Sequence, residues 1–171
     1  MYYFRWYFFN FDQGYIYTIG DNTYGELGVE NYKYSEEFIR IAFFDSMRKD
    51  IVKAIAGGRN SIVLLNTGDI YVFGDNSEGQ CTGLISRYTI PTKITFEFEF
   101  DRPIDIETGY NHCVMKTESG KLYSWGDTLD DKLGTHDHNQ HCPIAKQVSK
   151  IVGKKIFSIH LGKNITILLT N

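Results

Sequence analysis

The sequence predicts an all-β protein made of four-stranded antiparallel sheets, arranged as about three consecutive blades of a β-propeller. Three observations carry this prediction. A segment rich in glycine and tyrosine recurs three times, beginning at Gly14, Gly68 and Gly120, so that successive copies lie 54 and 52 residues apart. A second segment recurs in step with the first. The third observation is the period itself, because strand-like runs repeated about every 50 residues are typical of propeller blades.

The first segment ends each time in a turn that begins with glycine and aspartate. An alternating run such as Tyr15–Ile19 precedes the turn, as expected for a half-buried strand. The aspartate side chain is short enough to accept backbone N–H groups of its own turn. We therefore interpret the repeated carboxylates as architecture rather than catalysis. The residues expected to build these turns are Gly20, Asp21, Gly28, Gly74, Asp75, Gly126 and Asp127.

The second segment predicts a β-hairpin in front of each later copy. Gly57, Gly109 and Gly162 mark the same place in this segment, 52 and 53 residues apart. Apolar runs on both sides of Asn66–Asp69 indicate two strands joined by a tight turn, in which Gly68 supplies the left-handed backbone. Gly120 takes the same position in the next copy.

Two further strands are expected to complete each unit. Residues 38–43 and 51–55 provide them early in the chain, and residues 144–148 and 155–159 provide them later. Residues 34–40 allow a short helix, with a loop as an equal alternative. We expect one domain, 1–171, with sequence copies at about 3–56, 57–108 and 109–161, and with 162–171 beginning a further copy.

The composition argues against several classes of partner and compartment. With 18 Lys and Arg against 21 Asp and Glu, the chain has a formal charge of −3 and no basic surplus for direct nucleic-acid binding. Its three cysteines are widely spaced, which favours a reducing compartment, cytoplasmic or nuclear. The apolar run Met1–Phe11 is too short to span a bilayer and lacks the features of a signal peptide. We expect it to form a core strand, with a membrane-surface anchor as the alternative.

The recurring motifs resemble those of the regulator of chromosome condensation repeat family. The shared pattern is Gly-x-(Ile/Leu)-Tyr-x-(Ile/Phe/Trp)-Gly-Asp-Asn-x-x-Gly-(Glu/Gln)-Leu-Gly, preceded by Gly-x-x-His. The third copy matches best in its strands, with Gly109, His112, Gly120, Trp125 and Gly126. The resemblance covers about residues 5–171 and implies blades of a seven-bladed propeller.

Several residues depart from the family pattern. His112 has no counterpart in the other copies, where Asn60 and Ile165 stand, and Cys81 replaces the motif leucine. In the third turn, the sequence Asp-Asp-Lys at 130–132 stands where the family pattern has a glycine. About three blades cannot close a seven-bladed ring, so we expect further blades, a second copy or a partner protein to complete it.

An alternating acidic segment is the candidate binding site. Residues 96–100 read Phe-Glu-Phe-Glu-Phe, which would place phenylalanines on one face of a strand and carboxylates on the other. An ordinary solvent-facing strand is the alternative. The candidate binding residues, expected to meet a basic partner surface, are Glu97, Glu99, Asp101 and Arg102.

We find no arrangement of residues that predicts catalysis, a cofactor or a standard metal site. His136, His138, His141 and Cys142 carry donor atoms that zinc accepts, but their spacing fits no standard zinc site. The favoured function is a non-catalytic repeat scaffold for protein–protein interaction. The alternative, implied by the family resemblance, is a guanine-nucleotide exchange factor for a Ran-type small GTPase.

Overall fold

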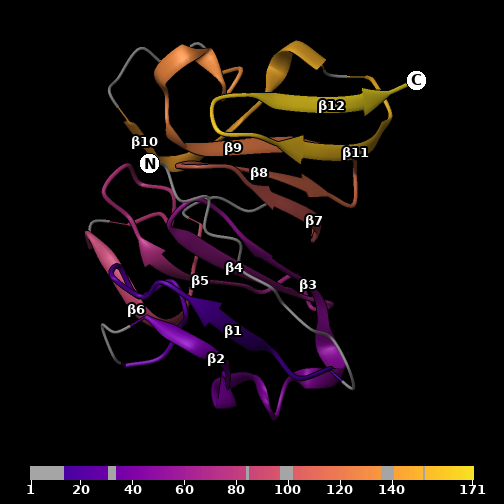
Figure 1. Cartoon of the computed structure of the whole chain (residues 1–171). Helices are drawn as coiled ribbons and strands as arrows, with labels where there is room; N and C mark the ends of the chain where they lie inside the picture. Colours follow the sequence, from indigo (N-terminus) through magenta and orange to yellow (C-terminus); the bar gives the residue numbers. More distant parts are fainter. Residues whose placement is uncertain (1–13, 31–33, 84, 97–101, 136–140, 152) are drawn as a thin grey trace.

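A computed structural model of the protein describes residues 14–30, 34–83, 85–96, 102–135, 141–151 and 153–171, which form four antiparallel sheets side by side (Figure 1). Among these residues no helix is long and apolar enough to cross a membrane. The strands are β1 Tyr17–Gly20, β2 Ser35–Arg40, β3 Ile51–Ala56, β4 Asn60–Leu65, β5 Ile70–Asp75, β6 Arg87–Lys93, β7 Pro103–Thr108, β8 His112–Thr117, β9 Leu122–Asp127, β10 His141–Gln147, β11 Ile156–Leu161 and β12 Thr166–Thr170. Short 3₁₀ turns lie at Ala42–Phe44, Arg48–Asp50, Leu129–Asp131 and Ser149–Ile151.

The two central sheets are complete four-stranded antiparallel blades, and the outer two are half as wide. One blade has the order β3-β4-β5-β6 and the next has the order β7-β8-β9-β10, whereas β1-β2 and β11-β12 are two-stranded. This arrangement confirms the predicted all-β class and the four-stranded antiparallel blade. Gly57 lies between β3 and β4. A copy of the sequence repeat that begins at Gly57 therefore contains β4, β5 and β6 of one sheet and β7 of the next.

The helix alternative for residues 34–40 is wrong, because Ser35–Arg40 forms strand β2. This strand pairs antiparallel with β1, with Tyr17 opposite Arg40 and Thr18 opposite Ile39. Pairing satisfies the backbone N–H and C=O groups of both segments, which a helix this short would leave largely unpaired.

Apolar side chains pack between successive sheets rather than in one central core. Strand β4 shows why, because all six of its residues are buried. Ile62 faces the blade β7–β10, where it packs in a cluster with Met115 and Trp125, whereas Val63 faces the sheet β1–β2 and packs with Phe44 and Phe73. A third cluster joins the blade β7–β10 to β11–β12. Each central blade is therefore buried on both faces.

The outer face of β11–β12 carries the same apolar pattern, and no sheet among the described residues covers it. Ile62 and Val114 occupy one position in the repeat and are 0% and 2% exposed, because the following sheet covers them. Ile167 occupies that position in β12 and is 54% exposed. The described residues therefore form part of a propeller, consistent with the predicted fold.

The innermost strands β3, β7 and β11 lie next to one another and are joined partly by charge. Lys53 on β3 donates a hydrogen bond to Asp105 on β7 over 2.8 Å, and it also pairs with Glu107 on the same strand. Burial lowers the pKa of Lys53, but the hydrogen bonds to the two carboxylates outweigh this effect, so the pKa is raised. Lys53 therefore remains charged and links two blades.

Two glycines allow the inner ends of the sheets to approach closely. A Cβ added to Gly57 would lie 2.6 Å from the carbonyl oxygen of Gly109, and a Cβ added to Gly109 would lie 2.6 Å from the carbonyl oxygen of Gly162. Both contacts are with backbone, which cannot turn away as a flexible side chain could. Any larger residue would push neighbouring sheets apart.

We predict that Gly109→Ala lowers the free energy of unfolding by about 1–3 kcal/mol, because the added methyl group overpacks the joint between sheets. Urea unfolding followed by circular dichroism measures the change. Ser46→Ala, at an exposed turn, is the control and should stay within about 0.5 kcal/mol of the parent protein. Equal stability of Gly109→Ala and the parent would show that the sheets do not need this close approach.

Candidate interaction surface

The loops at one end of the sheets are built from repeated turns. Asp21, Asp75 and Asp127 each accept a hydrogen bond from the backbone N–H two residues further on, at 3.2, 3.0 and 2.9 Å. This is the turn chemistry expected from the sequence. In the first two loops the following asparagine closes the turn, because the side-chain oxygens of Asn22 and Asn76 accept the N–H groups of Leu27 and Cys81.

One hydrogen bond recurs wherever a loop meets the next sheet. The hydroxyl of Ser61 donates to the carbonyl oxygen of Glu26 over 2.8 Å. The thiol of Cys113 donates to the carbonyl oxygen of Gln80 over 3.2 Å, and the indole N–H of Trp125 donates to the same oxygen. The third instance joins Thr166 to the carbonyl oxygen of Lys132 over 2.8 Å. These three bonds hold each loop against the sheet that follows it.

The third loop keeps this geometry with different residues. Asp131 stands where Gly25 and Gly79 stand in the earlier loops, and it adopts the same left-handed backbone with φ of 52°. Lys132 replaces the Glu or Gln of the motif, and its side chain is 1% exposed. Its ammonium group pairs with the motif aspartate Asp127, so a largely buried ion pair takes the place of the motif Glu or Gln.

His112 lies buried at the same joint and is held neutral. Its Nε2 lies 3.2 Å from the hydroxyl oxygen of Thr166. Since that hydroxyl donates its proton to the carbonyl of Lys132, Nε2 is the donor and carries the hydrogen. The pKa of His112 is lowered to about 4, mainly by burial and in addition by the positive charge of Lys132, while Asp127 opposes the shift.

A row of alternating aromatic and cationic side chains crosses the loop end of successive sheets. The guanidinium of Arg59 lies 4.7 Å from the ring centre of Tyr24 and 5.8 Å from that of Tyr110. The ammonium of Lys163, on the next sheet, also lies near Tyr110, 5.3 Å from its ring centre. Asp75 is 3.9 Å from Arg59. We call Tyr24, Arg59, Tyr110 and Lys163 the loop-end row.

The loop-end row has the composition of a protein-binding surface. Arg59 has 42% of its side chain exposed, and Tyr24 and Tyr110 are half-buried. Tyrosine and arginine dominate binding energy in protein interfaces, because each combines a large, ordered contact area with hydrogen-bonding capacity. Contacts between ring and cation restrain these side chains before any partner arrives, which reduces the entropy lost on binding.

The sequence did not single out this row, although a signal was present. Arg59 comes two residues after Gly57, Tyr110 one residue after Gly109, and Lys163 directly follows the next repeat glycine. Large aromatic or cationic residues at the tip of every copy could have marked a shared surface. Because these residues lie about one repeat apart along the sequence, a search for local clusters does not find them.

Of the four binding residues predicted from the sequence, only Arg102 is among the described residues. Glu97, Glu99 and Asp101 lie outside the described residues. Arg102 lies at the opposite end of the sheets from the loop-end row. It donates to the carbonyl oxygen of Asn66 over 2.8 Å and pairs with Glu118 at 3.1 Å. Arg102 therefore contacts two hairpin turns of neighbouring blades.

The histidine-rich segment is also only partly described, since His136 and His138 lie outside the described residues. His141 lies 4.0 Å from the carboxylate of Glu78, and the thiol of Cys142 donates to the carbonyl oxygen of Ile144. Among the described residues, no three His, Cys, Asp or Glu side chains gather as a metal site.

Repeated turns, shared carbonyl acceptors and close-packed glycines define the class of this protein: a β-propeller repeat protein. Comparison with known families agrees. A family model described as the regulator of chromosome condensation (RCC1) repeat matches residues 51–80 and 104–128, and a second model with the same description matches residues 67–115. The chain belongs to the regulator of chromosome condensation repeat family.

Curated relatives and solved structures support the same family. The chain is 33% identical over 144 residues to the X-linked retinitis pigmentosa GTPase regulator of Mus musculus, covering 82% of this chain and 14% of that protein. It is 23% identical over 167 residues to the Regulator of chromosome condensation of Mus musculus, covering 95% of this chain and 38% of that protein. The chain thus spans less than half of the length of these relatives.

Two solved structures share the fold. Prp20p from Saccharomyces cerevisiae superposes with a TM-score of 0.79 at 19% identity, covering 91% of this chain and 39% of that one. Human WBSCR16 superposes with a TM-score of 0.77 at 22% identity, covering 94% of this chain and 41% of that one. At these identities the likeness concerns the fold alone.

We predict that His112 makes stability fall in acid. The unfolded histidine takes up a proton near its ordinary pKa of 6.5, whereas the folded one does so only near pH 4. Between these values the unfolded state binds more protons, so the free energy of unfolding falls by about 3 kcal/mol as the pH is lowered from 6.5 to 4. Above pH 6.5 this contribution is fully present.

His112→Asn tests this prediction, because asparagine does not titrate and already stands at the same repeat position as Asn60. Urea unfolding at several pH values between 4 and 7 should show a shallower pH dependence for the variant. Identical slopes for the variant and the parent protein would mean that His112 is not the group responsible.

Proposed function

We propose that this protein is a non-catalytic repeat scaffold that binds another protein through the loop end of its sheets. The observation that carries the proposal is the loop-end row, in which two partly exposed tyrosines and two cationic side chains, one residue from each of the four sheets, form one ordered surface. Binding of this kind needs area and complementarity rather than reactive groups. The repeated aspartates serve their own turns, which is consistent with a role in architecture.

The family supports this proposal at the level of class. Repeats of this family occur in proteins whose names describe regulators, among them the GTPase regulator and the Regulator of chromosome condensation described above. A cytoplasmic or nuclear location, expected from the sequence, remains part of the proposal.

We predict that the double variant Arg59→Ala/Tyr110→Ala loses protein partners without losing its fold. Removing both groups takes away the centre of the row, and both side chains are partly exposed, so circular dichroism and melting should change little. Capture from a cell extract followed by quantitative mass spectrometry compares the double variant with the parent protein. Lys93→Ala, an exposed change on the outer strand β6, is the control.

Proteins retained by the parent and by Lys93→Ala but lost from the double variant would support the proposal. If all three forms retain the same proteins to the same extent, the loop end is not the interaction surface.

Guanine-nucleotide exchange on a Ran-type small GTPase is the second candidate. Two observations favour it. The chain is 34% identical over 84 residues to a Secretion-regulating guanine nucleotide exchange factor of Mus musculus, which covers 48% of this chain and 18% of that protein. The structure of Prp20p was described together with its binding to Gsp1p and histones. Exchange needs only a surface that stabilises the nucleotide-free GTPase, so the lack of a predicted catalytic group does not argue against it.

We predict that exchange activity, if the chain has it, depends on the loop-end row. Release of mant-GDP from a Ran-type GTPase should accelerate with micromolar protein, and Arg59→Ala/Tyr110→Ala should reduce the acceleration by at least about tenfold. Release at the intrinsic rate in the presence of the parent protein removes this candidate and leaves the scaffold proposal in place.

A further inference from the structure

At the end of the sheets opposite the loops, neighbouring sheets pack closely at two contacts but not at a third. Hairpin glycines at this end normally pack against the segment that leads into the next inner strand. A Cβ on Gly14 would lie 2.5 Å from the carbonyl oxygen of Arg48, and a Cβ on Gly68 would lie 2.8 Å from the Cγ of Arg102 and 2.9 Å from the Cδ of Pro103. Gly120 occupies the same position, but no described atom lies within 4 Å of its added Cβ.

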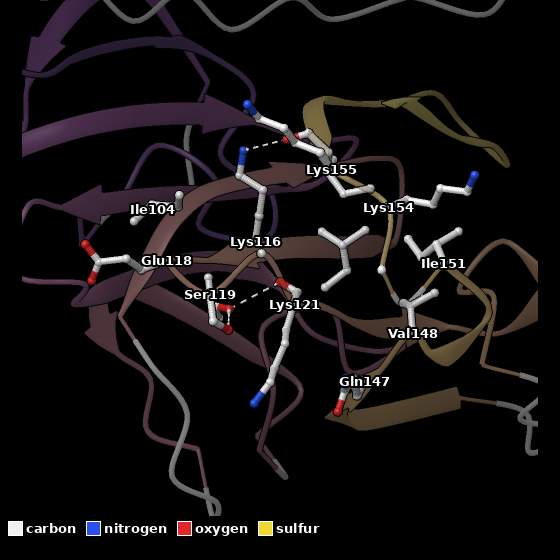
Figure 2. A pocket seen from close by; sticks show the side chains of 15 residues that line it. Ile104, Lys116, Glu118, Ser119, Lys121, Gln147, Val148, Ile151, Lys154 and Lys155 are labelled. Atoms are coloured by element: carbon white, nitrogen blue, oxygen red, sulfur yellow. Dashed lines mark hydrogen bonds between the residues drawn. The ribbon is translucent and has the colours of Figure 1, made fainter. Parts of the chain in front are cut away.

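A cavity of about 650 Å³ opens at this joint. It lies between the β8–β9 hairpin and the segment that leads from β10 into β11 (Figure 2). Lys116 and Lys121 line it from the hairpin side, and Lys154 and Lys155 line it from the segment before β11; the ammonium groups of Lys121 and Lys154 point outward at its edge (Figure 2). The apolar part of its lining includes Ile104, Leu122, Val148, Ile151 and Ile156.

The positive charge of these lysines is not balanced by the carboxylate nearby. Glu118 is the acidic residue among the lining groups, and its carboxylate pairs with Arg102 at 3.1 Å and points away from the lysines (Figure 2). Lys116 donates one hydrogen bond to the carbonyl oxygen of Ile156 over 3.2 Å, which orients its ammonium group and leaves further N–H groups available. The cavity therefore combines a cationic rim with an apolar interior.

We infer that this cavity binds an acidic peptide segment of a partner protein, one in which carboxylates alternate with large apolar side chains. Carboxylates would meet the lysines at the rim, and an apolar side chain would enter the part of the cavity lined by Val148 and Ile151. Two features favour this ligand over a small anion. The volume is in the range of pockets that enclose ligands of many atoms, and a bare anion would leave the apolar lining in contact with water.

The site is independent of the loop-end row, which lies at the other end of the sheets. Lys121 and Lys154 are both exposed at the surface, so changing them should leave folding intact. The two sites can therefore be tested separately.

We predict that a fluorescein-labelled peptide of alternating Glu and Phe binds the parent protein, with fluorescence anisotropy as the measurement. Lys121→Glu/Lys154→Glu should weaken binding by at least about tenfold, because it replaces attraction at the rim by repulsion. The control Lys49→Glu/Lys93→Glu changes net charge equally but lies outside both the cavity and the loop-end row, and it should weaken binding by less than about twofold at physiological salt.

Three further arms separate the alternatives. Binding by Arg59→Ala/Tyr110→Ala equal to that of the parent would support a site distinct from the loop-end row, whatever becomes of the proposed function. A peptide of alternating Glu and Ser should bind at least about tenfold more weakly than the Glu–Phe peptide, because it cannot fill the apolar interior. Equal binding of the two peptides, equal weakening by the two charge-reversal variants, or stronger binding of a single-stranded oligonucleotide would each overturn the inference.

Discussion

The structure depends on a carbonyl oxygen that each loop offers to the sheet after it. Glu26, Gln80 and Lys132 differ in side chain, yet each contributes its backbone oxygen to a hydroxyl or thiol on the next sheet. That bond forms only if neighbouring sheets approach closely, which is why the inner positions require Gly57 and Gly109. Apolar clusters between the sheets then supply most of the stabilisation, because burial of apolar surface outweighs single hydrogen bonds.

The third joint shows how far the repeat can vary while keeping this geometry. Lys132 replaces the motif Glu or Gln and forms a largely buried ion pair with the motif aspartate Asp127, and His112 lies beside this pair in its neutral form. Buried charges need partners because removing them from water is costly. The same joint thus acquires a dependence on pH that the joints built from Asn60 and Ser61 do not share.

The two ends of the sheets are chemically different surfaces. At the loop end, ring and cation contacts order a row of side chains across four sheets. At the opposite end, a gap in hairpin packing leaves lysines around an apolar cavity. Both features arise where sheets meet, so a single blade would contain neither.

Strands, hairpins and turns could be predicted because their signals are local. The apolar runs at 62–65 and 70–73, with Gly68 in the turn between them, indicate a hairpin from local residue preferences alone. Local signals were not sufficient for the segment 34–40. Its sequence pattern allows a helix, and only pairing with β1 makes it a strand. The acidic candidate site rested on another local pattern, and of its four residues only Arg102 is described.

The sequence by itself determined the repeat, the all-β class and the turn chemistry of each aspartate, because these follow from neighbouring residues. Tertiary structure alone decided which side chains share a surface. Arg59 meets Tyr110, and Lys116 and Lys154 line one cavity, only because sheets stack at a fixed distance and bring together residues from different copies of the repeat. Contacts between sheets depend on that stacking distance, which no single copy of the repeat encodes.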